Sequence, residues 1–105
     1  MQYRVVFTPE ALMQLEALYR YIAMAASPVV ANRYTSAIVT YCESIQSFPL
    51  RGTRRDDIRP GLRVTNYKGR AVIAFAVEAQ AVSIIGVYYG GQDYESVLKW
   101  DEDVQ

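Results

Sequence analysis

The chain has 105 residues and a mass of 11.9 kDa, 51% of its residues are hydrophobic, and its 11 basic and 11 acidic residues give no formal net charge. With only six glycines and four prolines, this composition excludes a disordered or collagen-like chain and predicts a single domain with one core. The absence of histidine and the single cysteine exclude an internal disulfide, the usual zinc sites and any Ser-His or Cys-His catalytic pair. We therefore expect neither a metal nor a cofactor.

The hydrophobic segments are short. The longest apolar run, Ala71 to Val77, has seven residues, whereas a membrane-spanning helix needs about 20. The N-terminal residues Met1 to Arg4 lack the order of charged and apolar residues that is typical of a signal peptide. We therefore expect a soluble, cytoplasmic protein with no membrane partner.

The beginning of the chain predicts a strand followed by a helix. Apolar residues alternate over residues 3–7, as in a short strand with one buried face. Thr8 followed by Pro9 is typical of a helix start, because threonine accepts a hydrogen bond from an otherwise unpaired backbone N–H and proline needs no such partner. A helix is predicted from Pro9 to near Ala25. Its apolar stripe consists of Leu12, Leu15, Leu18, Tyr19 and Ile22.

A second helix follows at once. Ser27 and Pro28 repeat the start signal, so the two helices are predicted to form an antiparallel hairpin. Pro49 and Gly52 mark the end of the second helix. Its apolar stripe consists of Tyr34, Ile38, Tyr41, Cys42, Ile45 and Phe48. Because Cys42 lies inside this stripe, we interpret it as a core residue and not as a reactive thiol.

The rest of the chain predicts a loop and three strands. Residues 52–61 are polar and rich in arginine, so we interpret them as a loop. Three β-rich runs over 62–67, 70–77 and 81–88 are separated by connections of hairpin length, which predicts an antiparallel meander. Residues 93–98 predict one or two turns of helix. The result is an α+β fold of order β-α-α-β-β-β, with a helical hairpin packed on a small antiparallel sheet and a short C-terminal helix.

Charge is unevenly distributed along the chain. Residues 51–70 contain seven basic and two acidic side chains, whereas residues 93–105 contain five acidic side chains and one lysine. Two interpretations of the basic segment stay open. Arg54 and Arg55 pair locally with the adjacent Asp56 and Asp57, or the arginines bind an acidic partner or nucleic acid.

Several short motifs occur in the order and spacing of a known family. They are 3-YRVVFTPEA-11 with Leu15; 21-YIA-23; Ala31, Arg33, Tyr34, Ala37 and Ile38; Phe48-Pro49 and Arg51-Gly52; 55-RDDIRPGLR-63; Tyr67; and 82-VSIIGVYYGGQDYE-95. In these motifs, which extend from about Tyr3 to about Leu98, the chain resembles toxins of the RelE/ParE superfamily, and most of all the ParE branch.

The resemblance implies a toxin of a bacterial type II toxin-antitoxin system. The expected partner is a ParD-like antitoxin with a DNA-binding N-terminal domain, whose C-terminal segment wraps the toxin. ParE-like members poison DNA gyrase, whereas RelE-like members cut messenger RNA on the ribosome. The resemblance gives no reason to expect direct sequence-specific binding of nucleic acid by the toxin itself.

The residues near the last strand decide between these two activities. Cleavage of RNA needs groups that activate the ribose 2′-hydroxyl and protonate the leaving oxygen. The chain has no histidine, and Gln92 is neutral where relatives often carry an arginine. We therefore favour a gyrase inhibitor without catalytic residues. If the protein is an RNase instead, Arg70 and Tyr94 are the catalytic candidates; an inactive module that binds an antitoxin is the third possibility.

Two sets of binding residues are predicted. The candidates for contact with the target are basic or aromatic residues of the middle and C-terminal segments: Arg55, Arg59, Arg63, Tyr88, Tyr89 and Tyr94. The candidates for contact with the antitoxin lie on the two helices: Leu12, Leu15, Tyr19, Tyr34 and Ile38. The apolar stripes exceed what a small sheet covers, so we expect part of the helical hairpin and the exposed sheet face to form a hydrophobic groove for the antitoxin.

Overall fold

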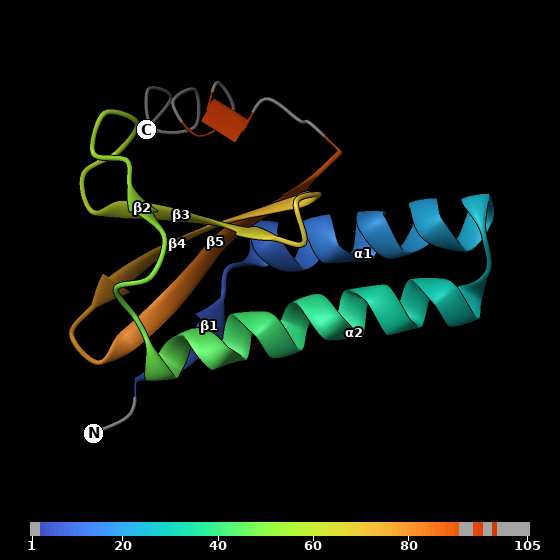
Figure 1. Ribbon diagram of the computed structural model, residues 1–105, viewed down its shortest axis with the longest axis horizontal. Helices are drawn as coiled ribbons and strands as arrows, with labels where there is room; N and C mark the ends of the chain where they lie inside the picture. The colour runs from blue at the N-terminus through green and yellow to red at the C-terminus, as the bar shows by residue number, and fades with distance from the viewer. Residues whose placement is uncertain (1–2, 91–93, 96–97, 99–105) are drawn as a thin grey trace.

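The computed structural model describes residues 3–90, 94–95 and 98. The helices and strands follow in the order β1 (Arg4–Phe7), α1 (Pro9–Ala25), α2 (Pro28–Ser44), the 3-10 helix η1 (Ile45–Ser47), β2 (Thr53–Arg54), β3 (Leu62–Tyr67), β4 (Ala71–Glu78) and β5 (Ala81–Tyr89). The two helices run side by side on one face of the sheet, and the described part of the C-terminal segment lies on the other side (Figure 1). Within the described residues, no helix is both long enough and apolar enough to span a membrane.

Both helices begin where the sequence predicts. The Thr8 hydroxyl accepts a hydrogen bond from the Ala11 N–H at 3.1 Å, and the Ser27 hydroxyl accepts one from the Val30 N–H at 3.2 Å. A proline follows each cap, where its missing N–H leaves no helical hydrogen bond unmade. The predicted helical hairpin is confirmed.

The sheet is mixed, with the strand order β1-β5-β4-β3-β2. Strands β3, β4 and β5 form the predicted antiparallel meander. The prediction of a wholly antiparallel sheet was wrong for β1, which pairs in parallel with β5, Val5 lying opposite Val82. The predicted loop also contains a two-residue strand, β2, paired with β3. The strand over residues 3–7 was predicted, but its parallel pairing was not, because that pairing is non-local; β2 was not predicted because it is too short to show a period.

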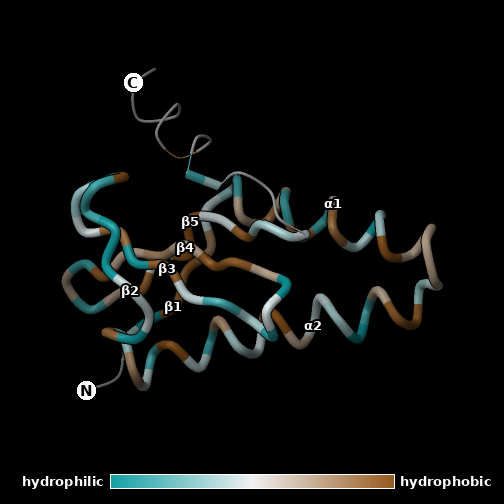
Figure 2. The backbone as a smooth tube through the Cα atoms, turned by 45° about the horizontal axis from the view of Figure 1, so that its top comes forward, coloured by the Kyte–Doolittle hydropathy of each residue, from teal (hydrophilic) through white to brown (hydrophobic). Residues whose placement is uncertain are grey.

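Two apolar clusters hold the molecule together, one on each face of the sheet. Figure 2 shows hydrophobic residues recurring along both helices and along the strands of the sheet. The larger cluster lies between the sheet and the helices, and Cys42 is fully buried in it, as predicted. The smaller cluster covers the opposite face. Its buried members are Ile58, Leu62, Val64, Ala74, Tyr88 and Leu98. The composition predicts a single core, and this second cluster was not predicted.

An irregularity in β5 decides which side chains reach which face. Phe75 lies opposite Ile84 while Ala74 lies opposite Gly86, so Ile85 is an extra residue in β5. The bulge shifts the alternation, and Tyr88 points to the smaller cluster whereas Tyr89 packs on the helix side.

The predicted C-terminal helix is seen at Tyr94, Glu95 and Leu98, which are helical. Asp93, its predicted cap, lies outside the described residues, as do Gln92 and the acidic end of the chain.

Candidate functional site

A row of five tyrosines crosses the helix side of the molecule. Adjacent ring centroids are 6.4 Å apart for Tyr21 and Tyr89, 5.7 Å for Tyr89 and Tyr34, 6.1 Å for Tyr34 and Tyr67, and 5.2 Å for Tyr67 and Tyr41. Tilted and edge-to-face pairs at such distances are the favoured aromatic geometry. We call these five residues the tyrosine row; it joins side chains from α1, α2, β3 and β5 into one surface.

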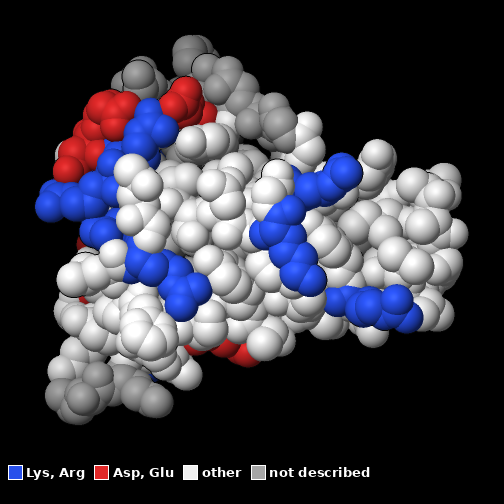
Figure 3. Space-filling model, in the orientation of Figure 1, with Lys and Arg blue, Asp and Glu red and all other residues white. Residues whose placement is uncertain are grey.

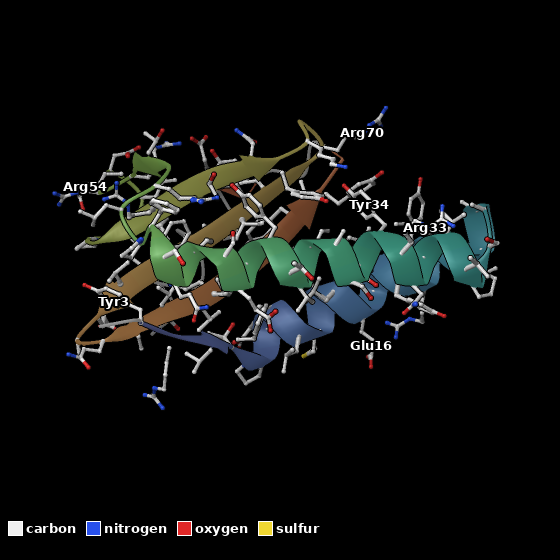
Figure 4. All side chains as sticks on the ribbon, turned by 60° about the horizontal axis from the view of Figure 1, so that its bottom comes forward. Tyr3, Glu16, Arg33, Tyr34, Arg54 and Arg70 are labelled. Carbon is white, nitrogen blue, oxygen red and sulfur yellow. The ribbon has the colours of Figure 1, made fainter. Side chains whose placement is uncertain are left out.

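The centre of the row contains a polar atom without a partner. The Tyr34 hydroxyl is buried and forms no hydrogen bond within the part of the chain that the structure describes. Burial raises the pKa of Tyr34, the neighbouring Tyr89 and Tyr67 raise it further, and Arg70 opposes these effects. The row therefore holds a neutral hydroxyl donor near an exposed guanidinium. Figure 4 labels Tyr34 and Arg33 on α2 and Arg70 near the end of the β3–β4 hairpin.

Basic side chains surround the tyrosine row. The Arg51 guanidinium lies 5.2 Å from the ring centroid of Tyr41, and the Lys68 ammonium lies 5.6 Å from that of Tyr67. Arg33 and Arg70 are exposed. On the face of the molecule drawn in Figure 3, basic groups gather over α2 and over the strands, and most of the acidic side chains are confined to one corner.

The arginine-rich loop is mostly self-paired. Arg54 pairs with Asp56 at 2.8 Å, and Arg55 pairs with both Asp57 and Glu95. Arg55 also donates to the Tyr94 hydroxyl at 3.2 Å, and its carboxylate partners raise its pKa. The interpretation of this loop as local ion pairs is therefore confirmed for Arg54 and Arg55.

Two other arginines of this segment bind backbone carbonyls. Arg59 donates to the Leu98 carbonyl at 3.0 Å, and Arg63 donates to those of Leu50 and Arg51. Both arginines are predicted candidates for target contact, but in the structure each one holds a segment of this chain in place. The guanidinium groups of Arg59 and Arg63 are therefore both bound within this chain.

The remaining target candidates divide between the two faces of the sheet. Tyr88 is only 4% exposed, because the bulge at Ile85 turns it into the smaller cluster, so the prediction of an exposed contact was wrong for this residue. Tyr94 packs against Tyr88 and accepts from Arg55. Only Tyr89 belongs to the tyrosine row.

The two RNase candidates do not form a pair in this structure. Tyr94 packs on the smaller cluster, whereas Arg70 influences the pKa of Tyr34 on the helix side. The smaller cluster leaves the sheet face beside Tyr94 apolar. Among the described residues, no group of three Asp, Glu or Cys side chains has the arrangement of a metal site.

The antitoxin candidates do not form one continuous surface. Leu15 and Tyr19 line a groove between α1 and α2, on the side away from the sheet, although Leu15 is only 8% exposed and belongs to the larger cluster. Leu12 is 55% exposed on α1. Tyr34 lies instead in the tyrosine row, and Ile38 is completely buried in the larger cluster. Ile38 therefore offers no side-chain surface to a partner.

Sequence reasoning missed Tyr21, Tyr67, Arg33 and Arg51 as surface residues. Tyr34 and Tyr41 are seven residues apart and share a helix face, which is visible in the sequence. Tyr67 and Tyr89 join them only through the pairing of β3, β4 and β5, where Ala71 lies between the two tyrosines, and Tyr21 of α1 joins by packing on Tyr89.

Comparisons with known proteins agree with this architecture. A solved structure titled a chromosomal ParDE toxin-antitoxin system from P. aeruginosa matches with a TM-score of 0.75 and 20% identity, over 85% of this chain and 97% of the other. The RelBE2 toxin-antitoxin complex from Mycobacterium tuberculosis matches with a TM-score of 0.62 and 20% identity, over 85% and 99%. No curated protein sequence matches significantly. The family model for the ParE toxin of the type II toxin-antitoxin system parDE matches residues 5–94, and the chain therefore belongs to the ParE toxin family.

Proposed function

We propose that this toxin acts by binding DNA gyrase and not by cleaving RNA. The observation that carries the proposal is the smaller apolar cluster, which fills the sheet face beside the last two strands. Cleavage of RNA needs several polar groups around one phosphate. The residues of β4 and β5 that pack in the smaller cluster on this face are Val72, Ala74, Ile85 and Tyr88, none of which is charged. The pairing of Tyr94 with Arg55 further supports a structural role for Tyr94.

A test on purified components separates the two activities. The toxin is expected to inhibit supercoiling by gyrase, or to trap cleaved DNA, while messenger RNA on translating ribosomes stays intact. The same assays contradict the proposal if messenger RNA is cut at defined codons and gyrase is unaffected. Growth of bacteria in which the toxin is induced alone distinguishes a toxin from an inactive antitoxin-binding module, since the module leaves growth unchanged.

The proposed partner of the toxin in the cell is a ParD-like antitoxin. The solved relatives with this fold are components of ParDE and RelBE toxin-antitoxin systems, which supports such a partner. We place its contact on α1 and along the groove between the helices, at Leu12, Leu15 and Tyr19. Under this proposal both partners act in the cytoplasm, where gyrase and its DNA lie.

The antitoxin contact is expected to be hydrophobic and thus to resist salt. Raising the salt concentration from about 0.05 to about 0.5 M is expected to change the dissociation constant less than tenfold, because apolar burial is not screened. Leu12→Asp is expected to weaken binding, whereas Met24→Asp, at a more exposed position at the far end of α1, serves as its control. A large loss of affinity with salt, or equal effects of the two substitutions, contradicts this placement of the contact.

A further inference from the structure

Four basic side chains around the tyrosine row have no acidic partner among the described residues. They are Arg33, Arg51, Lys68 and Arg70, whereas Arg20, Arg54 and Arg55 each pair with a carboxylate. Fixed charges of one sign, placed around an aromatic surface, attract a partner of opposite charge. We call the tyrosine row and these four residues the tyrosine surface.

The Tyr34 hydroxyl adds a donor to this surface. A buried hydroxyl without a hydrogen bond is costly, and the cost is recovered if a neighbouring side chain shifts on binding and admits an acceptor from the partner. The acceptor that suits both the Tyr34 hydroxyl and the nearby Arg70 guanidinium is an anionic oxygen. The exposed ring of Phe48, 5.7 Å from the Arg51 guanidinium, extends the surface with an apolar contact.

We propose that the tyrosine surface binds the protein target of the toxin, through a segment of that target in which carboxylates flank apolar side chains. The inference rests on the proposed function only in that the toxin acts by binding a protein. Tyrosine and arginine are the residues that contribute most often to the strong contacts of protein interfaces. The tyrosine surface combines tyrosines at its centre with arginines and a lysine around them.

The ring packing favours a protein over a nucleic acid. Binding of single-stranded nucleic acid relies on aromatic faces on which bases stack. Tyr34 is instead packed edge-to-face with both Tyr67 and Tyr89, and Lys68 and Arg51 lie over the rings of Tyr67 and Tyr41. The rings of the row thus contact one another and the cations, and the Tyr41 hydroxyl is bonded to Thr65, so no ring of these pairs offers both faces to a stacking base.

The position of the surface favours the target over the antitoxin. The proposed antitoxin groove is lined by Glu16, whose carboxylate pairs with Arg20, and by apolar and hydroxyl side chains of both helices. The tyrosine surface lies on the other side of α2, next to the β3–β4 turn. A toxin that binds two partners through separate surfaces allows substitutions that affect one partner alone.

Charge reversal tests the inference. Arg33→Glu with Arg70→Glu changes the charge of two exposed side chains of the tyrosine surface. Arg4→Glu with Arg20→Glu makes the same change in charge at exposed positions on β1 and α1, away from the surface, and serves as the matched control. Growth arrest after induction, affinity for the antitoxin and thermal unfolding are measured for both variants and the wild type.

The Arg33/Arg70 variant is expected to lose growth arrest, to weaken gyrase inhibition at least about tenfold, and to keep its folding and its antitoxin affinity within about twofold. The control is expected to stay toxic. Undiminished growth arrest by the folded variant overturns the inference, and so does a parallel loss of antitoxin affinity, which assigns the surface to the antitoxin. Binding of a single-stranded oligonucleotide that is lost in the variant assigns the surface to nucleic acid. Failure of the wild type to inhibit gyrase refutes only the gyrase proposal, since growth arrest still compares the variants.

Discussion

Gly86 is needed in β5 because the Tyr88 ring lies over it. A Cβ atom at position 86 would lie 2.6 Å from both Cε2 and Cζ of Tyr88, well inside van der Waals contact. Tyr88 is only 4% exposed and is enclosed by the smaller cluster, so a shift of its ring would disturb that packing. One glycine thus lets a large aromatic residue close the sheet face opposite the helices.

Gly86→Ala is therefore expected to destabilise the protein by about 1–3 kcal/mol, the usual cost of overpacking a core. Urea unfolding measures this loss. In a Tyr88→Leu background the same substitution is expected to cost less, since the ring that causes the clash is gone. An equal cost in both backgrounds would show that the clash is not with Tyr88.

Cys42 illustrates how burial fixes the chemistry of a single side chain. Desolvation in the larger cluster raises the pKa of its thiol from about 9 to about 12, and Glu43 adds to the shift. The thiol is fully buried, so we expect alkylating reagents to modify it only after unfolding.

The same shift predicts a dependence of stability on pH. The unfolded thiol ionises near pH 9 and the folded one near 12, so the contribution to stability is complete below pH 9 and is lost between pH 9 and 12. The loss is at most about 1.4 kcal/mol per pH unit. The difference in unfolding free energy between wild type and Cys42→Ala is expected to shrink between pH 8 and pH 10.5. A constant difference would contradict the shift.

At the scale of elements, Thr8 links the start of α1 to β5. Its hydroxyl accepts from the Ala11 N–H and donates to the Ile85 carbonyl at 3.1 Å, beside the bulge. Gln14 makes a second link, since its side-chain oxygen accepts from the Val87 N–H at 2.7 Å. The Thr8 cap and Gln14 of α1 thus form hydrogen bonds with backbone groups of β5 beyond Ile84, where the pairing with β1 ends.

Thr8→Ala is expected to cost about 1–2 kcal/mol, because it removes a cap and leaves the Ile85 carbonyl without its donor. Ser27→Ala removes only an exposed cap and is expected to cost about 0.5–1 kcal/mol. Chemical unfolding of both variants compares the two roles directly. Equal losses would mean that the bond to Ile85 contributes nothing.

The elements that could be predicted from the sequence are those with local signals. Threonine or serine before proline located both helix starts, and the hairpin connections ordered β3, β4 and β5. The parallel pairing of β1 and the bulge at Ile85 depend on contacts between distant segments. Because that bulge reverses the facing of Tyr88, the prediction of an exposed Tyr88 failed with it.

At the scale of the whole molecule, the two faces of the sheet have different roles. The face opposite the helices is closed by its own apolar cluster, and the arginines beside it pair with Asp57, Glu95 and backbone carbonyls. The helix side carries the tyrosine surface. The sequence shows the charge of residues 51–70 but not which arginines are used internally, since that depends on where the loop meets the C-terminal segment.

Under the proposed function, the toxin acts by stoichiometric contact with gyrase and not by turnover. The most direct measurement is a titration of toxin against gyrase at several gyrase concentrations, with ribosome-bound messenger RNA followed in parallel. We predict that the toxin concentration needed for half-inhibition rises in proportion to the gyrase concentration once binding is tight, while the messenger RNA stays intact. The proposed function would be contradicted if each toxin molecule cut many messenger RNA molecules while gyrase stayed unaffected.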